Sequence, residues 1–260
     1  MSNVEVLSHP KAVSMADEWF QFATADHFWM QWRHCMVARA VKQSGVSVQR
    51  ALEVGCGHGV ARELLERDFD FAVDGCDLNQ KALEMARPGR GRLLVYDVLE
   101  QSLPEQYDAV FLLDVIEHVP DDVAFVQAAS RHLRPGGLII LNVPAHRRLA
   151  SDYDRIAGHL RRYSRRQMAN LLRLCEIQPG AIWQWGLSMV PLLVARKALL
   201  ASNRSDRSET VLRNGFVPPT KTANLLLHAL KNLETILPFP MPLGSSILAW
   251  GTVSRFSPRN

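Results

Sequence analysis

The sequence predicts an α/β protein built on a doubly wound, mainly parallel sheet. Short apolar runs alternate with helix-like segments from about residue 50 to residue 185. One run, YDAVFLLDVI (107–116), is apolar almost throughout, as expected of a parallel strand covered on both faces. Three glycines at alternate positions follow the first run, where such folds turn from strand into helix. Strands that alternate with helices in this way imply right-handed crossovers between parallel strands.

The central segment contains six predicted strands and four predicted helices. Asn79 and Ser164 are the predicted N-caps of two helices, because their side-chain oxygens can accept a hydrogen bond from the first turn. The Pro-Gly-Gly at 135–137 is predicted to be a turn before the fifth strand. The strands are 50–56, 71–78, 92–98, 107–116, 138–145 and 180–185, and the helices are 60–68, 79–87, 121–133 and 164–176.

Two regions lie outside this alternation. Residues 10–45 are helix-rich and contain three of the six tryptophans. Residues 187–243 contain two apolar helices separated by a polar stretch, with Pro191 in the first turn of the first helix, where proline is tolerated. A last strand is expected within 244–256. The predicted organisation is an N-terminal helical cap (1–48), a core (49–186), a helical insertion (187–243) and the last strand of the core sheet (244–260).

Composition limits the classes of function. The 260 residues suit one large domain with an added cap, and a net charge of +4 is too small to predict a nucleic-acid partner. The four cysteines have no CxxC spacing and no cluster of other metal ligands beside them. We therefore expect free thiols and no metal site. No signal peptide and no run of 18 apolar residues is present, which predicts a cytoplasmic protein without a transmembrane helix.

The stretch ALEVGCGHGV (51–60) predicts a binding loop. Gly55, Gly57 and Gly59 follow the first strand, and Glu53 lies two residues before the first glycine. Dinucleotide sites have the spacing G-x-G-x-x-G, and their pyrophosphate would be repelled by an unpaired carboxylate. An ammonium or sulfonium would be attracted by it. The loop therefore favours a cationic nucleoside over a nucleotide diphosphate; a tight turn with glycines for packing alone is the alternative.

Acidic residues end the next two strands. Asp77 lies 20 residues after Gly57, at the end of the second strand, where an acid can accept hydrogen bonds from both ribose hydroxyls. Asp97 ends the third strand and could accept from an adenine amino group, while Val98 offers a backbone N–H. A strand-end cap is the alternative for Asp97 taken alone.

Taken together, these segments resemble the class I S-adenosylmethionine-dependent methyltransferases. The likeness is to the small-molecule type, similar to the ubiquinone-pathway O-methyltransferase group, and it covers about residues 49–145. It implies a seven-stranded Rossmann-like sheet whose last strand, at 246–254, is antiparallel and lies beside strand six. The helical insertion then falls between strands six and seven. The matching segments are LEVGCGHG, VDGCDLN, VYDV, YDAVFLLDVIEHVPD and LRPGGLIILNVPA.

The resemblance implies S-adenosylmethionine as the cofactor and S-adenosylhomocysteine as its product. Glu53 and the glycine loop, with Cys56, would hold the methionine part, and Asp77 the ribose. Leu78 would lie against the adenine, with Asp97 and Val98 at its edge, and Leu113 and Asp114 under the sulfonium. The expected reaction is in-line transfer of the methyl group to a small-molecule acceptor, on a hydroxyl or carboxyl oxygen.

One histidine is the candidate general base. His118, in DVIEHVPD, follows the fourth strand near the expected position of the methyl group, and an imidazole suits removal of a hydroxyl proton. The alternative is that His118 packs or caps its loop. No metal is required for this chemistry, and none is expected.

A second cluster, at 145–167, contains seven arginines against two aspartates. It predicts a lip that binds an anionic group of the acceptor; a solvated loop is the alternative, and RNA contact is disfavoured by the modest charge. In the leading helices, HFWMQWRHC contains Trp29, expected to pack in the core, and Arg33. The candidate acceptor residues are Arg33, His146, His159, Arg162 and Tyr163.

Several alternatives stay open at this point. The acceptor atom could be nitrogen or carbon. A nicotinamide-dependent oxidoreductase is disfavoured by Glu53 and the glycine spacing, and a non-catalytic cofactor-binding partner protein is disfavoured by the intact series of motifs. The insertion is expected to cap the acceptor, but dimerisation or peripheral membrane contact through 187–236 would also fit its apolar helices. The chain is expected to be a monomer or a homodimer.

Overall fold

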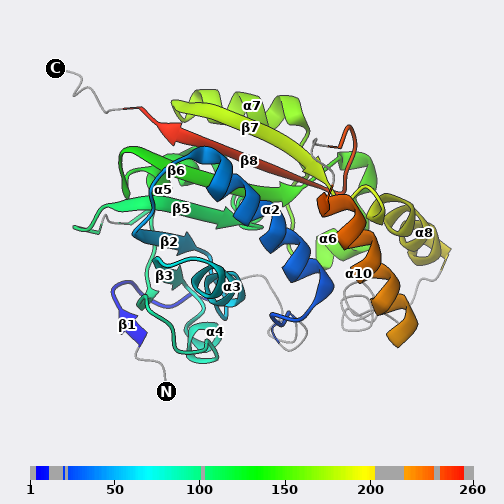
Figure 1. The fold of residues 1–260 in the computed structure, drawn as a ribbon, viewed down its shortest axis with the longest axis horizontal. Helices are drawn as coiled ribbons and strands as arrows, with labels where there is room; N and C mark the ends of the chain where they lie inside the picture. Colours follow the sequence, from blue (N-terminus) through cyan, green and yellow to red (C-terminus); the bar gives the residue numbers. More distant parts are fainter. Residues whose placement is uncertain are drawn as a thin grey trace.

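An eight-stranded sheet forms the centre of the computed structural model, which describes residues 4–11, 20, 23–100, 103–202, 220–236 and 241–254. The strand order is β1-β4-β3-β2-β5-β6-β8-β7; β8 is antiparallel to both of its neighbours, and the other pairs are parallel (Figure 1). This confirms the doubly wound sheet and its antiparallel last strand. The strands are β1 Val4–Val6, β2 Arg50–Val54, β3 Ala72–Asp77, β4 Leu93–Val95, β5 Tyr107–Leu113, β6 Leu133–Pro144, β7 Ile177–Trp185 and β8 Ser246–Val253.

Two expectations about the sheet were wrong. The count of seven strands misses β1, which lies in the segment expected to be helical and pairs in parallel with β4 at the outer edge. The Pro-Gly-Gly at 135–137 is not a turn between elements, because β6 runs through it from Leu133. Leu133 already pairs with Tyr107, and the register then shifts before Leu138 pairs with Ala109. Gly136, with φ of +80°, supplies the backbone conformation that this irregularity needs.

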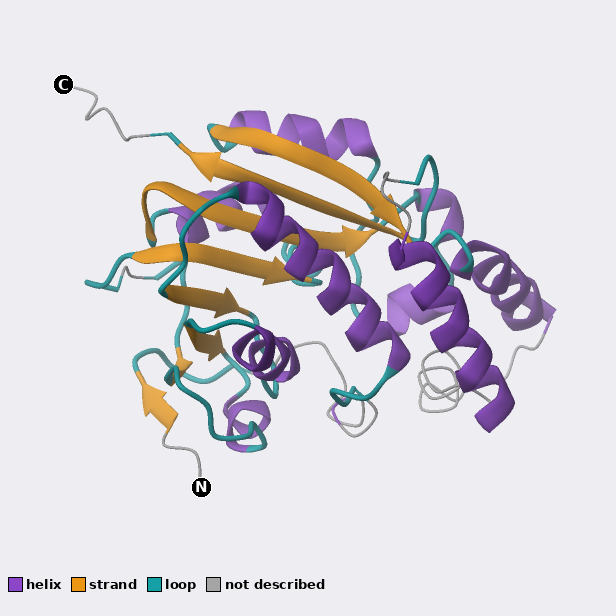
Figure 2. Ribbon diagram, viewed as in Figure 1, coloured by secondary structure: helices purple, strands orange, loops and turns teal. Residues whose placement is uncertain are grey.

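Helices cover both faces of the sheet (Figure 2). Alternate residues of the central strands point to opposite faces: Leu52 and Leu112 pack in the cluster with α5 and α7, whereas Ala51 and Phe111 pack in the cluster with α2 and α3. The helices are α2 Phe28–Ser44, α3 Val60–Asp68, α4 Gln80–Glu84, α5 Asp122–Ser130, α6 Asp152–Ile156, α7 Arg165–Leu174, α8 Met189–Ser202 and α10 Lys221–Ile236, with a short 3₁₀ helix, η1, at Arg147–Leu149. The N-caps Asn79 and Ser164 are confirmed.

The predicted insertion contains the helices α8 and α10. Helix α10 lies beside α2 (Figure 1), and its Leu227 packs in the same cluster as Phe28. Glu234 of α10 accepts hydrogen bonds from the backbone N–H groups of Leu187 (3.2 Å) and Ser188 (3.5 Å), which precede α8. A carboxylate at a helix N-terminus is favourable, so this contact joins the two helices. Pro191 lies in the first turn of α8, as expected.

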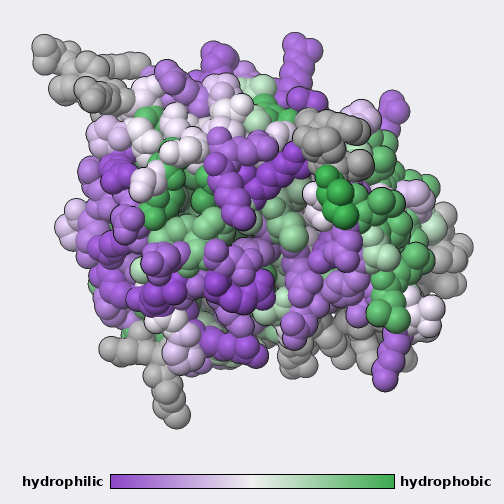
Figure 3. Space-filling view, viewed as in Figure 1, coloured by the Kyte–Doolittle hydropathy of each residue, from purple (hydrophilic) through white to green (hydrophobic). Residues whose placement is uncertain are grey.

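Helix α10 also leaves large apolar side chains exposed. Leu225, Leu226, Leu233 and Ile236 are 60–77% exposed, and Figure 3 shows hydrophobic residues gathered on this side of the molecule. Among the described residues, no helix is both long and apolar enough to span a membrane. The four cysteines are free thiols, as expected.

Candidate functional site

A cavity of about 370 Å³ opens at the carboxyl ends of the central parallel strands. This is the edge at which doubly wound sheets bind their ligands. The loops after β2, β3, β4 and β5 form its wall, and α2 contributes from the N-terminal side. Of the sequence-predicted residues, those that line it are Arg33, Glu53, Gly55, Cys56, Gly57, Asp77, Leu78, Asp97, Val98, Leu113, Asp114 and His118.

The glycine loop after β2 requires its glycines. Gly55, Gly57 and Gly59 have φ of +72°, +53° and +76°, a region that other residues rarely adopt. A Cβ atom on Gly55 would lie 2.6 Å from a methyl carbon of Val115. Gly59 is the N-cap of α3 and is not among the residues that line the cavity, although the sequence analysis assigned it to the cofactor.

Glu53 presents a buried carboxylate to the cavity. The residue is 3% exposed, and its Oε2 has no hydrogen-bond partner among the described residues. Burial raises the pKa of Glu53 to about 7, against the opposing effect of the Arg33 guanidinium. A buried ionised group without a partner is costly, so this site favours a cation beside Glu53.

Asp77 and Asp97 occupy the ends of β3 and β4, as expected. Asp77 accepts hydrogen bonds from the backbone N–H groups of Gly57 and Asn79, both at 2.8 Å, and therefore holds the glycine loop against β3. Asp97 accepts from the N–H of Leu99 (3.0 Å) and from the ammonium of Lys11 (2.8 Å). Lys11 carries no signal in the sequence, because only the pairing of β1 with β4 brings this residue to Asp97.

A hydrogen-bond network fixes the end of β5. Asp114 has a left-handed backbone (φ +60°), and its carboxylate accepts from Arg33 Nη1 and Asn142 Nδ2, both at 2.7 Å. The side-chain oxygen of Asn142 accepts from Trp185 Nε1 at 3.0 Å. Trp29 packs against Trp185, with ring centroids 4.6 Å apart and the ring planes tilted by 31°, which confirms its packing role. The wall below the cavity is thus joined to the core.

Glu117, His118 and His159 form a second polar group, beside the hydrogen-bond network of Asp114. His118 lines the cavity and follows the fully buried Glu117. Burial lowers the pKa of His118 to about 4 and raises that of Glu117 well above its usual value. His159 lies against His118, with ring centroids 4.8 Å apart. Near neutral pH His118 is therefore a neutral imidazole.

The other candidate acceptor residues have partners inside the protein and do not line the cavity. His146 bonds to the side chain of Gln184 at 2.5 Å. Arg162 donates to Asp154 (2.6 Å) and to the carbonyl of Ala145 (3.0 Å). The hydroxyl of Tyr163 donates to Asp122 at 2.7 Å. The structure therefore gives these three side chains structural contacts and does not bring them together as an anion-binding lip.

Comparison with known proteins decides the family. The profile of a family described as "Methyltransferase domain" matches residues 19–175, more than half of the chain. The chain belongs to this methyltransferase family. Together with the strand order, the match confirms the resemblance to class I S-adenosylmethionine-dependent methyltransferases and favours methyl transfer over the oxidoreductase alternative.

Individual relatives match part of this methyltransferase. Ubiquinone biosynthesis O-methyltransferase from Vibrio cholerae is 30% identical over 109 residues, covering 39% of this chain and 44% of that protein. The protein of the same name from Pseudomonas aeruginosa is 25% identical over 150 residues, covering 55% and 64%. The chain thus spans less than two thirds of either relative. The fold is similar to that of phosphoethanolamine N-methyltransferase 2 from Haemonchus contortus, solved with S-adenosyl-L-methionine (TM-score 0.54, 18% identity, 85% of this chain and 52% of that one).

Several lining residues of the methyltransferase carried no signal in the sequence. They are apolar or aromatic and come from scattered segments, so only the fold shows that they meet. A histidine inside the glycine motif, His58, could have been noticed from its position alone. The missed residues are Phe20, Met30, Val54, His58, Val60, Ala61, Cys76, Tyr96, Val115, Val119 and Phe125.

The network below the cavity can be tested by stability. Asn142 is completely buried, so Asn142→Leu would leave the Trp185 N–H and one Asp114 oxygen without a partner. Because each unsatisfied buried group costs about 1–3 kcal/mol, we expect urea unfolding to show a loss of about 2 kcal/mol or more. The exposed Asn170→Leu is the matched control, expected to change stability by less than about 0.5 kcal/mol. Equal effects of both substitutions would contradict the assigned network.

Proposed function

We propose that this methyltransferase binds S-adenosylmethionine in the cavity and transfers its methyl group to an oxygen of a small-molecule acceptor. The observation on which this rests is the buried carboxylate of Glu53 beside the glycine loop, whose Oε2 has no hydrogen-bond partner among the described residues. The relatives from Vibrio cholerae and Pseudomonas aeruginosa are named O-methyltransferases, which supports oxygen as the acceptor atom. The cofactor of the Haemonchus contortus enzyme supports the choice of cofactor.

The residues present fit this cofactor. Glu53 and the glycine loop would hold the methionine end, with the carboxylate facing its ammonium. Asp77 would accept from the ribose hydroxyls, and Leu78, Asp97 and Val98 would border the adenine. When bound, S-adenosylmethionine supplies a methyl group already activated by a positive sulfur. The protein then has to position the acceptor, exclude water and manage the acceptor's proton.

The acceptor would enter from the side of Asp114 and His118. His118 is the candidate general base, and its neutral imidazole can accept a proton. A pKa of about 4 gives it little driving force, because a general base works best with a pKa near the operating pH. Leu113 and Asp114, at the end of β5, would lie under the reacting group.

We also propose that residues 187–243 shape the acceptor side of the cavity. Their described residues do not line the cavity themselves. Helix α10, however, packs on α2, and Lys231 donates to the side chain of Gln31 at 3.4 Å. Gln31 belongs to α2 and lies between Met30 and Arg33 in the sequence, and both of these residues line the cavity. The insertion would thus set the position of that wall.

The pH dependence of binding tests the role of Glu53. With a pKa of about 7 in the free protein, Glu53 must lose its proton to face a cation. Affinity for S-adenosylmethionine should therefore rise by roughly five- to tenfold between pH 6 and pH 7.5, with a proton released on binding. Calorimetry in two buffers of different ionisation enthalpy measures both quantities. In Glu53→Gln, binding should be weaker and nearly independent of pH; an unchanged pH profile would show that Glu53 does not face the cation.

A further inference from the structure

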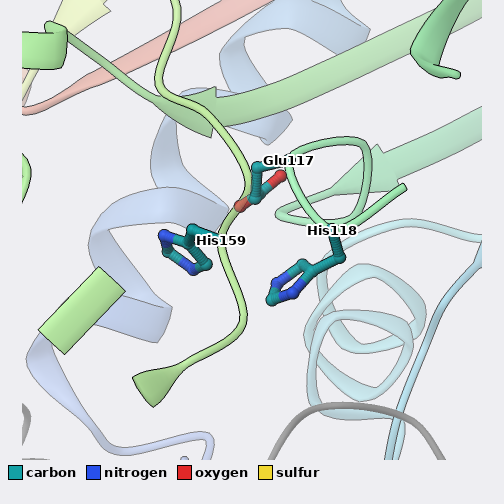
Figure 4. Close-up of side chains that lie close together, drawn as sticks. All are labelled: Glu117, His118 and His159. Atoms are coloured by element: carbon teal, nitrogen blue, oxygen red, sulfur yellow. The ribbon is translucent and has the colours of Figure 1, made fainter. Parts of the chain in front are cut away.

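Three potential ligand side chains converge beside the cavity. Glu117 and His118 belong to the loop after β5, and His159 belongs to the segment between α6 and α7 (Figure 4). One ligand atom from each lies within 4.8 Å of the others. The two segments are tied together, because the N–H of Leu160 donates to the carbonyl of Glu117 at 2.8 Å. The cluster is thus fixed by the backbone of both segments.

Three polar atoms of this cluster lack a hydrogen-bond partner among the described residues. Glu117 is 0% exposed, and neither of its carboxylate oxygens accepts a hydrogen bond from any described residue. The buried Nε2 of His118 is also without a partner in the described part of the chain. The nearby guanidiniums are directed elsewhere: Arg33 to Asp114 and Arg162 to Asp154. Buried polar groups are normally satisfied, and such a group left unpaired is costly.

The histidine from the other segment is oriented by a carboxylate. Asp154 Oδ1 lies 3.1 Å from His159 Nδ1. Asp154 is itself held by Arg162 and by the backbone N–H of Ser151 (2.8 Å). A carboxylate that holds one ring nitrogen and leaves the other free is the usual support of a metal-ligating histidine. His159 Nε2 is therefore available to a ligand.

We propose that Glu117, His118 and His159 form a binding site for a divalent transition-metal ion of the zinc class. Two imidazoles and one carboxylate are a ligand set of catalytic zinc sites, which keep a further coordination position open. Imidazole nitrogens disfavour magnesium, which prefers oxygen ligands. Small rotations of the three side chains would bring the ligand atoms to the distances of about 2.0–2.2 Å that zinc requires. The open position would face the cavity, since His118 lines it.

The role of this ion rests on the proposed function. An acceptor hydroxyl bound at the open position loses its proton to solvent water more readily, because the ion stabilises the oxyanion. The oxygen then forms a bond to the methyl carbon, the bond from sulfur to that carbon breaks, and its electron pair stays on sulfur as a neutral thioether. His118 then acts as a metal ligand, a role that does not require its buried imidazole to be a strong base.

Titration of the full, metal-stripped chain with Co²⁺ tests the site without any methyl transfer. We expect one equivalent per chain, with visible d–d absorption, displaced by Zn²⁺ but not by millimolar Mg²⁺. Glu117→Gln and His159→Asn should each weaken Co²⁺ binding by at least tenfold, whereas His9→Ala, which removes an exposed histidine, should not change it. Circular dichroism checks that each variant is folded. If one of the two ligand variants does not fold, the other alone tests the site.

The outcomes separate the two proposals. Absence of stoichiometric Co²⁺ binding, or binding that survives in the folded ligand variants, would overturn the metal site. Binding of S-adenosylmethionine is measured separately by calorimetry. If the ion binds and the cofactor does not, the proposed function fails while the metal site stands; the reverse result removes only the metal site.

Discussion

Replacing Asp77 by alanine is expected to weaken binding of S-adenosylmethionine by about 100-fold, or about 2.7 kcal/mol. Asp77 would lose its role as acceptor for the ribose hydroxyls, where each unpaired group costs about 1–3 kcal/mol. The substitution also releases the N–H groups of Gly57 and Asn79, so the glycine loop loses its attachment to β3. Calorimetry with S-adenosylmethionine and with S-adenosylhomocysteine measures the effect.

Two further variants separate these contributions. Asp77→Asn keeps one side-chain oxygen and should lose less affinity than Asp77→Ala. Asp70→Ala removes an exposed acid that lies away from the cavity and should leave affinity unchanged. Affinity within twofold of the native chain in Asp77→Ala would show that the ribose assignment is wrong.

Replacing Arg33 by methionine is expected to lower the free energy of unfolding by about 3 kcal/mol. Arg33 is 7% exposed and donates to Asp114 at 2.7 Å, so its removal leaves a mostly buried carboxylate without its cation. The effect should be at the lower end of the range for broken buried pairs, because the Asp114 side chain is 26% exposed. Urea denaturation measures the change, with the dependence of the unfolding free energy on urea concentration (the m value) held the same for both proteins.

A double-mutant cycle tests whether the loss of stability in Arg33→Met comes from the unpaired charge of Asp114. Adding Asp114→Asn to Arg33→Met should recover part of the lost stability, because no uncompensated charge then remains. Lys42→Met, on the exposed side of the same helix, is the control and should cost less than about 1 kcal/mol. If the two single substitutions at Arg33 and Asp114 proved additive, the pair would not be coupled.

The central sheet could be predicted from the sequence because its signals are local. The apolar run of β5 and the glycines after β2 each reflect a requirement within a few residues of chain. The short strand β1 has no such signal: three residues at an edge are too few to show a period, and their strand character comes from pairing with β4. The turn predicted at 135–137 fails for the same reason, since pairing of Leu133 with Tyr107 overrides the local preference of Pro-Gly-Gly.

The site shows the same division. Glu53, Asp77 and Asp97 lie at predictable positions because each lies at or just after the carboxyl end of a parallel strand, and such strand ends meet at one edge of the sheet. The contact of Lys11 with Asp97 and the convergence of Glu117, His118 and His159 could not be predicted, because these contacts join segments far apart in the chain. Arg162 and Tyr163 lie in the arginine-rich stretch that predicts an anion-binding lip, and their burial in internal hydrogen bonds is not visible in the sequence pattern.

Calorimetric titration of the full chain with S-adenosylmethionine at pH 7.5 tests the central claim most directly. The structure predicts one molecule bound per chain, displaced by S-adenosylhomocysteine and bound about 100-fold more weakly by Asp77→Ala. Absence of binding at millimolar S-adenosylmethionine, or binding that S-adenosylhomocysteine does not displace, would contradict the assignment of the cavity.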